Sequence, residues 1–107
     1  MTGPIDNEMK VAFSPAANLD LTNIADYIAR GSPARALSFV AELEVKCLRL
    51  GQATGIGSAR PELGEGIRMF PNGRYLIFYR EQNGLVRIER IIRGARDIDG
   101  DDFELDR

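Results

Sequence analysis

Two Asn-Gly dipeptides, at positions 72–73 and 83–84, are the features that most restrict how this chain folds. Asn-Gly favours the two-residue type I′ turn of a β-hairpin, because both central residues of that turn need a positive φ. Around the dipeptides lie three runs rich in β-branched and aromatic residues: 67–70, 74–81 and 85–92. The second half of the chain is therefore predicted to form an antiparallel β-meander.

The tripeptide Ser-Pro-Ala occurs twice, at 14–16 and 32–34, and each copy predicts the start of a helix. The serine hydroxyl caps the first turn, and proline fits the first helical position because the N–H that it lacks would have no partner there. Apolar residues follow at helical spacing up to a glycine, namely Ala17, Leu21, Ile24 and Ile28 before Gly31, and Ala36, Val40, Leu43, Cys47 and Leu50 before Gly51. The short connection between the two segments predicts an antiparallel helical hairpin.

Together these elements predict a single α+β domain, in which an N-terminal helical hairpin packs on a small antiparallel β-sheet. Residues 10–13 alternate briefly and are expected to add a strand to the edge of that sheet. Residues 52–66 contain four glycines and a proline and are expected to be a loop. We expect a flexible leader at 1–8, the folded domain at 9–103 and an acidic tail at 104–107.

The composition excludes several kinds of functional site. The 107 residues include no histidine and a single cysteine, Cys47. An internal disulfide, a cysteine-rich zinc site and any Ser-His or Cys-His pair are therefore impossible, and we expect neither a metal nor a cofactor. Because no apolar run could span a bilayer and the N-terminus lacks a signal pattern, the sequence predicts a cytoplasmic protein.

Charge is distributed unevenly along the chain, although the net charge is only −2. Residues 60–96 carry eight arginines against four acids, whereas residues 97–107 carry six acids against one arginine. Within the stretch RIERIIRGARDI, at 87–98, an arginine recurs at every third residue. That period matches neither a helix nor a strand, so the arginines are not expected to form one basic stripe.

Two-residue turns fix how the strands pair, so the side chains on each face of the meander can be enumerated. In the predicted register Arg80 lies opposite Arg87, Tyr79 opposite Ile88, Leu76 opposite Ile91 and Met69 opposite Leu76. The first face then holds Arg68, Phe70, Tyr75, Ile77, Tyr79, Ile88, Arg90 and Ile92. The second face holds Ile67, Met69, Leu76, Phe78 and Ile91, with Arg80, Arg87 and Glu89 near the turn. A helical hairpin covers one face only, so the other is covered by the chain's own C-terminal tail or by a protein partner.

The arginines divide between these faces. Arg68 and Arg90 flank Ile77 on the first face, and beneath the helices each would need a carboxylate or carbonyl partner. Candidate carboxylates are those of Asp20, Asp26, Glu44 and Asp97. On the second face Arg80 and Arg87 repel each other, and an acidic segment of a partner would relieve that repulsion. Arg93 shares the second-face parity if the strand extends that far, and Arg96 lies beyond the strand.

Several motifs in the same order resemble the ParE branch of the RelE/ParE toxin superfamily. They are FSPAA at 13–17, DYIA at 26–29, the S-P-x-x-A-x-x-F pattern at 32–39, RPELGEGIR at 60–68, GRYLIFYR at 73–80 and RIERIIRGARDI at 87–98. The resemblance runs from about Lys10 to Phe103, with one departure, since many relatives have histidine where this chain has Arg93.

The resemblance implies the toxin of a type II toxin–antitoxin system that inhibits DNA gyrase and is not an enzyme. Its partner would be a ParD-like antitoxin, bound in a hetero-oligomer, and direct nucleic-acid binding is not expected. The expected antitoxin-binding residues are those of the second face: Ile67, Met69, Leu76, Phe78, Arg80, Arg87 and Ile91. Arg68, Arg90, Arg93 and Arg96 are expected to be structural or to contact the target.

The other branch of the superfamily, the RelE-like toxins, cleaves messenger RNA on the ribosome. Such an endoribonuclease needs cations at the phosphate and a group that transfers protons. By resemblance, the cationic strand positions fall at Ile67, Met69 and Leu76, which are apolar here, and the tail position falls near Asp102-Phe103 among acids. Only Arg96 is retained, so RelE-like cleavage is the less favoured alternative. A non-toxic protein-binding module is a third reading.

Overall fold

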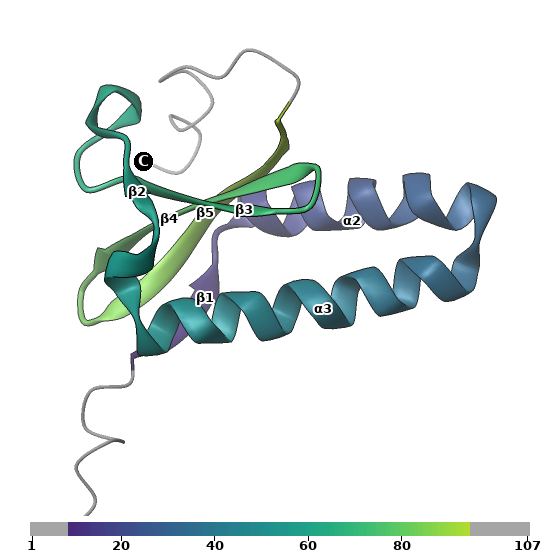
Figure 1. Ribbon diagram of the computed structural model, residues 1–107, viewed down its shortest axis with the longest axis horizontal. Coiled ribbons are helices and arrows are strands. Elements are labelled where there is room, and N and C mark those ends of the chain that lie inside the picture. The colour runs from purple at the N-terminus through teal and green to yellow at the C-terminus, as the bar shows by residue number, and fades with distance from the viewer. Residues whose placement is uncertain (1–8, 95–107) are drawn as a thin grey trace, which may run out of the picture.

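The computed structural model of the protein describes residues 9–94, which form two α-helices and a five-stranded sheet (Figure 1). In chain order the elements are β1 (Lys10–Phe13), α2 (Pro15–Gly31), α3 (Pro33–Gln52), the 3₁₀ turn η1 (Thr54–Ile56), β2 (Ser58–Ala59), the 3₁₀ turn η2 (Pro61–Leu63), β3 (Arg68–Asn72), β4 (Tyr75–Gln82) and β5 (Leu85–Arg93). This α+β arrangement confirms the predicted fold class. The expected leader, the acidic tail and Arg96 lie outside the described residues.

The helical hairpin begins as the two Ser-Pro-Ala tripeptides predict. The Ser14 hydroxyl accepts a hydrogen bond from the Ala17 N–H at 2.9 Å, and the Ser32 hydroxyl accepts one from the Arg35 N–H at 3.1 Å. Proline occupies the first turn of each helix. The two helices run antiparallel along one side of the sheet (Figure 1). Neither helix within residues 9–94 is long and apolar enough to cross a membrane.

The sheet is mixed rather than purely antiparallel, with the strand order β1-β5-β4-β3-β2. β1 does add to the edge of the meander, but it pairs with β5 in parallel. The intervening helices and hairpins bring β5 back in the direction of β1, which a long connection allows. The expected loop 52–66 also contributes β2, which pairs antiparallel with β3. The prediction of an all-antiparallel sheet was therefore wrong at the β1 edge, and the loop prediction for 52–66 missed β2 at the other edge.

The two Asn-Gly dipeptides form different turns. Asn83 and Gly84 both have positive φ, 54° and 80°, as the predicted type I′ turn requires. At the other dipeptide only Gly73 has positive φ, and Asn72 pairs with Tyr75 as the last residue of β3. The β3–β4 pairing is thus displaced by two residues from the predicted one, and Met69 lies opposite Phe78. Because the side-chain period of a strand is two, this displacement leaves every residue of β3 and β4 on its predicted face.

A β-bulge in β5 has the opposite effect. Tyr79 pairs with Ile88, but Phe78 pairs with Arg90, which leaves Glu89 as an extra residue. Beyond the bulge the pairing is displaced by one residue, so each later residue of β5 lies on the face opposite to the predicted one. Arg90 therefore pairs with Phe78 of the second face, while Ile91 lies on the first face and Ile92 on the second. The bulge reverses the predicted face of all three residues.

Side chains from the start of α2 satisfy the backbone groups at the bulge. The Ser14 hydroxyl donates to the Glu89 carbonyl at 2.8 Å, and the Ser14 N–H donates to the Ile88 carbonyl at 2.9 Å. One turn further along the helix, the Asp20 carboxylate accepts from the Ile91 N–H at 2.9 Å. Since buried backbone groups need partners, the α2 N-terminus and the bulge stabilise each other.

Two apolar clusters lie on opposite faces of the sheet. The larger one joins the helices to the first face through ten buried residues: Ala17, Phe39, Leu43, Cys47, Leu50, Ile77, Tyr79, Val86, Ile88 and Ile91. The smaller one lies on the second face and holds Leu63, Ile67, Phe78 and Ile92, with Met69 and Leu76 partly buried beside them. Within residues 9–94 the main core therefore lies under the helices, and the second face has only a thin cover.

Candidate partner-binding face

The second face brings together side chains from η2 and the three strands of the meander. Met69 from β3 and Leu76 from β4 are partly exposed there, whereas Phe78 and Ile92 beneath them are buried. Leu63 of η2 folds over this cluster and is 5% exposed. The segment between α3 and β3 thus covers part of the face.

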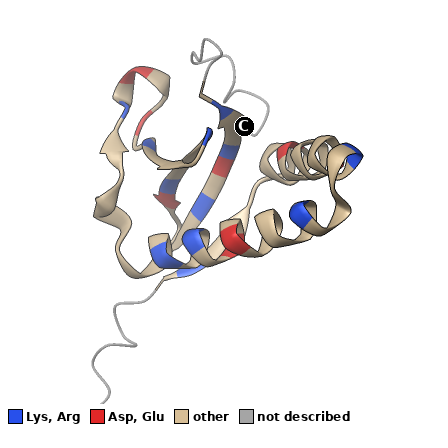
Figure 2. Cartoon of the chain, turned by 45° about the vertical axis from the view of Figure 1, so that its right-hand side comes forward, with Lys and Arg blue, Asp and Glu red and all other residues tan. Residues whose placement is uncertain are grey.

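Three arginines surround this apolar cluster. Arg60 lies beside Met69, with its Nη1 3.3 Å from the sulfur. Arg80 donates to the Glu65 carbonyl at 3.0 Å, and Arg87 to the Gln82 side chain at 3.4 Å. Basic and acidic bands also alternate along β5 (Figure 2). The rim is therefore mixed in charge rather than a continuous basic patch.

Glu89 relieves the repulsion between Arg80 and Arg87. Its Oε2 accepts a hydrogen bond from Arg80 Nε at 2.8 Å, and its Oε1 lies 3.9 Å from Arg87 Nε. The Glu89 side chain is completely buried, whereas the side chains of Arg80 and Arg87 are 24% and 22% exposed. Oε1 makes no hydrogen bond within the described residues. The chain itself thus supplies a carboxylate between the two arginines, where an acidic segment of a partner was expected.

Arg68 and Arg90 both find the oxygen partners that burial demands. Arg90 forms a bidentate pair with Asp20, at 2.7 and 2.8 Å, and both side chains are 14% exposed. Arg68 donates to the carbonyls of Gly55 and Gly57. These contacts confirm the expectation that carboxylate or carbonyl oxygens satisfy both guanidinium groups, and they identify Asp20 among the four candidates.

Most of the predicted second-face residues therefore lie together, and two do not. Ile91 belongs to the first-face cluster and Ile92 takes its place. Arg93 lies at the end of β5, past the bulge, and lines a hollow beside α2 instead of the second face. Leu63 was missed, because nothing in a glycine-rich segment indicates which residue turns inward.

Within residues 9–94 no cluster of acidic or cysteine side chains could hold a metal ion. Burial raises the pKa of the Cys47 thiol to about 12, with a smaller contribution from the nearby Glu44 carboxylate, so the thiol stays protonated. A protonated, buried thiol is a poor nucleophile, which confirms that Cys47 is a core residue.

Comparison with known proteins agrees with this architecture. The family model described as the ParE toxin of the type II toxin–antitoxin system parDE matches residues 11–98. The chain belongs to the ParE toxin family. A similar solved structure is the chromosomal ParDE toxin–antitoxin system from P. aeruginosa, with 26% sequence identity and a TM-score of 0.69. That match covers 81% of this chain and 97% of the other. No curated protein matched the sequence.

Proposed function

We propose that this ParE-family toxin inhibits DNA gyrase in the cytoplasm, breaks no bond itself, and is neutralised by a cognate ParD-like antitoxin in a hetero-oligomer. The match of the family model to residues 11–98 carries the proposal. The similar ParDE toxin–antitoxin structure supports an antitoxin as the partner.

The second face gives no support to RNA cleavage. The three positions that the RelE-like comparison assigns to cations hold Ile67, Met69 and Leu76, and Ile67 is only 1% exposed. The carboxylate at the middle of this face, Glu89, is fully buried and bound to Arg80. It could not reach a phosphodiester, and a general base must come within hydrogen-bond distance of the proton that it removes.

A gyrase assay tests the target. Purified toxin is added to gyrase and supercoiled plasmid, and cleaved DNA trapped by the enzyme is measured. The same toxin is added to ribosomes that are translating a defined messenger RNA. We expect trapped cleaved DNA and intact RNA. Ribosome-dependent cutting of the RNA without trapped DNA would reverse the assignment in favour of a RelE-like toxin.

For the antitoxin, we propose docking on the exposed part of the second face. Met69 and Leu76 offer partly exposed apolar surface, and Arg80 and Arg87 flank it with partly exposed guanidinium groups. Ile67, Phe78 and Ile92 lie under this surface and hold it in shape. A small apolar centre with arginines at its edge is the composition typical of protein interfaces.

Paired aspartate substitutions test this docking surface. Met69→Asp/Leu76→Asp should weaken antitoxin binding by roughly a hundredfold or more, since charges would replace the apolar centre of the interface. Leu37→Asp/Leu48→Asp is the matched control, because both leucines are exposed on α3, at 76% and 62%. Affinity is measured by calorimetry and folding by circular dichroism. Equal affinities for the two folded variants would refute the surface.

A further inference from the structure

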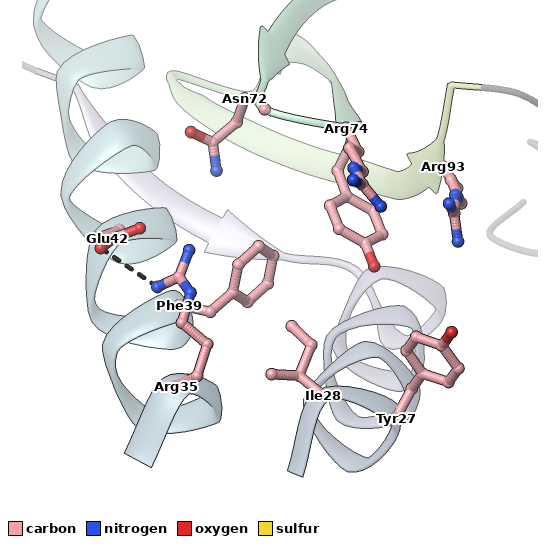
Figure 3. A pocket seen from close by; sticks show the side chains of 10 residues that line it. Tyr27, Ile28, Arg35, Phe39, Glu42, Asn72, Arg74 and Arg93 are labelled. Carbon is pink, nitrogen blue, oxygen red and sulfur yellow. Dashed lines mark hydrogen bonds and ion pairs between the residues drawn. The ribbon is translucent and has the colours of Figure 1, made fainter. Parts of the chain in front are cut away.

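A hollow of about 370 Å³ opens between the ends of the helical hairpin and the β3–β4 turn (Figure 3). Three arginines from separate elements line it: Arg35 on α3, Arg74 in the turn and Arg93 at the end of β5. Tyr27 of α2 and Tyr75 of β4 also line it. This hollow lies on the helix side of the sheet, away from the second face.

The hollow has an excess of positive charge. Among residues 9–94 its one acidic lining residue is Glu42, whose carboxylate lies 3.4 Å from Arg35 Nη1. Within residues 9–94, the exposed Arg74 and Arg93 side chains form no ion pair and no hydrogen bond. Two guanidinium groups are thus free to bind an oxyanion, and the planar fork of arginine suits a carboxylate bidentately.

A second hollow of about 290 Å³ adjoins the first and extends it. The two share Tyr27, Tyr75 and Arg93, and the second continues to Ile24 and Asn23 on α2. Together they form an elongated groove, which we call the arginine groove. Arg35 and Arg74 line its first hollow, Ile24 lines its second, and Arg93 lines both. A compact phosphate-bearing molecule would use only one end of it.

We propose that the arginine groove binds an acidic peptide segment of a partner protein. Carboxylates of the segment would pair with Arg74 and Arg93, and an apolar side chain would lie against Ile24 and the Tyr27 ring. Exposed tyrosines are suited to this role, because they offer a large contact area and lose little conformational entropy. A nucleic acid fits less well, since the chain carries a net charge of −2 and a polyanion would meet repulsion elsewhere on it. This proposal is independent of the antitoxin surface on the second face.

Titration of the full-length, ¹⁵N-labelled chain tests the proposal. The probe is a capped synthetic hexapeptide, Leu-Glu-Glu-Phe-Glu-Glu, compared with the same peptide carrying glutamine in place of each glutamate, and with adenosine monophosphate. We expect the acidic peptide to shift resonances of groove residues, and to bind about tenfold more tightly than the glutamine peptide. No binding by the acidic peptide, or tighter binding by the nucleotide, would overturn the proposal.

Charge-matched double variants locate the site. Arg74→Gln/Arg93→Gln should weaken peptide binding about tenfold, since two exposed charge pairs are lost. Lys10→Gln/Arg49→Gln removes the same charge from exposed positions on β1 and at the end of α3, outside the groove, and should change binding by less than about twofold. Equal weakening in both variants would show that only net charge matters, and would refute the groove as the site.

Discussion

The two faces of the sheet each hold an apolar cluster, but residues 9–94 cover them to very different degrees. On the first face the sheet and two long helices together bury ten residues, and Asp20 on α2 forms an ion pair with Arg90 in which both side chains are 14% exposed. On the second face η2 contributes Leu63, and Arg80 and Arg87 stay partly exposed around Glu89. Within residues 9–94 the first face therefore holds the larger part of the core, and the second is the face on which we propose that the antitoxin docks.

Leucine truncation on each face should give the largest contrast. Leu43 on α3 is fully buried in the first-face cluster, and Leu43→Ala should lower the free energy of unfolding by about 3–4 kcal/mol. Leu63→Ala should cost about 1–2 kcal/mol, because the short η2 segment can relax into the space left behind. Urea denaturation measures both values. If both variants lost the same free energy of unfolding, the second-face cluster would be as much a part of the core as the first-face cluster.

Neutralising the buried acid on each face should give the next largest difference. Asp20→Asn keeps the shape but leaves Arg90 buried without its counter-charge, and should cost about 3 kcal/mol. Glu89→Gln should cost about 1 kcal/mol, because Arg80 and Arg87 still reach water and a buried charge with an unpaired oxygen is removed. Thermal and urea unfolding compare the two. A larger loss for Glu89→Gln would contradict this ranking of the two carboxylates.

The smallest predicted effect concerns Cys47 and measures how well the first-face cluster excludes water. Burial raises the pKa of the Cys47 thiol from 9.0 to about 12, so the folded state holds this proton more tightly than the unfolded state does. The resulting stabilisation is complete below about pH 9 and is lost as the pH rises toward 12.

Relative to Cys47→Ala, the native chain should therefore be about 1 kcal/mol less stable at pH 10 than at pH 8. The difference between the two proteins removes the contribution of other groups that titrate in this range. A thiol that reacts rapidly with a thiol reagent in the folded protein at pH 8 would show that water reaches the cluster.

Much of the fold follows from local signals that the sequence displays directly. The Ser-Pro-Ala caps predict both helix starts, and β1 has the predicted bounds. The second Asn-Gly turn also has the predicted backbone. These features depend on residues close together in the chain, so neighbouring sequence is enough to specify them. The helical spacing did not place Phe39 in the core. It is nevertheless buried and packs edge-on against Tyr75, with ring centroids 5.3 Å apart.

The sequence by itself determined the order of the elements, the faces of β3 and β4, and the need of Arg68 and Arg90 for oxygen partners. Only the tertiary structure decided which face each residue of β5 occupies beyond Glu89. The bulge depends on Ser14 and Asp20, which lie about 70 residues away and supply partners for its backbone. A strand alternates by local rules, but a long-range contact can insert one residue and reverse the alternation. That single insertion exchanged Ile91 with Ile92 and turned Arg93 from the second face to the arginine groove.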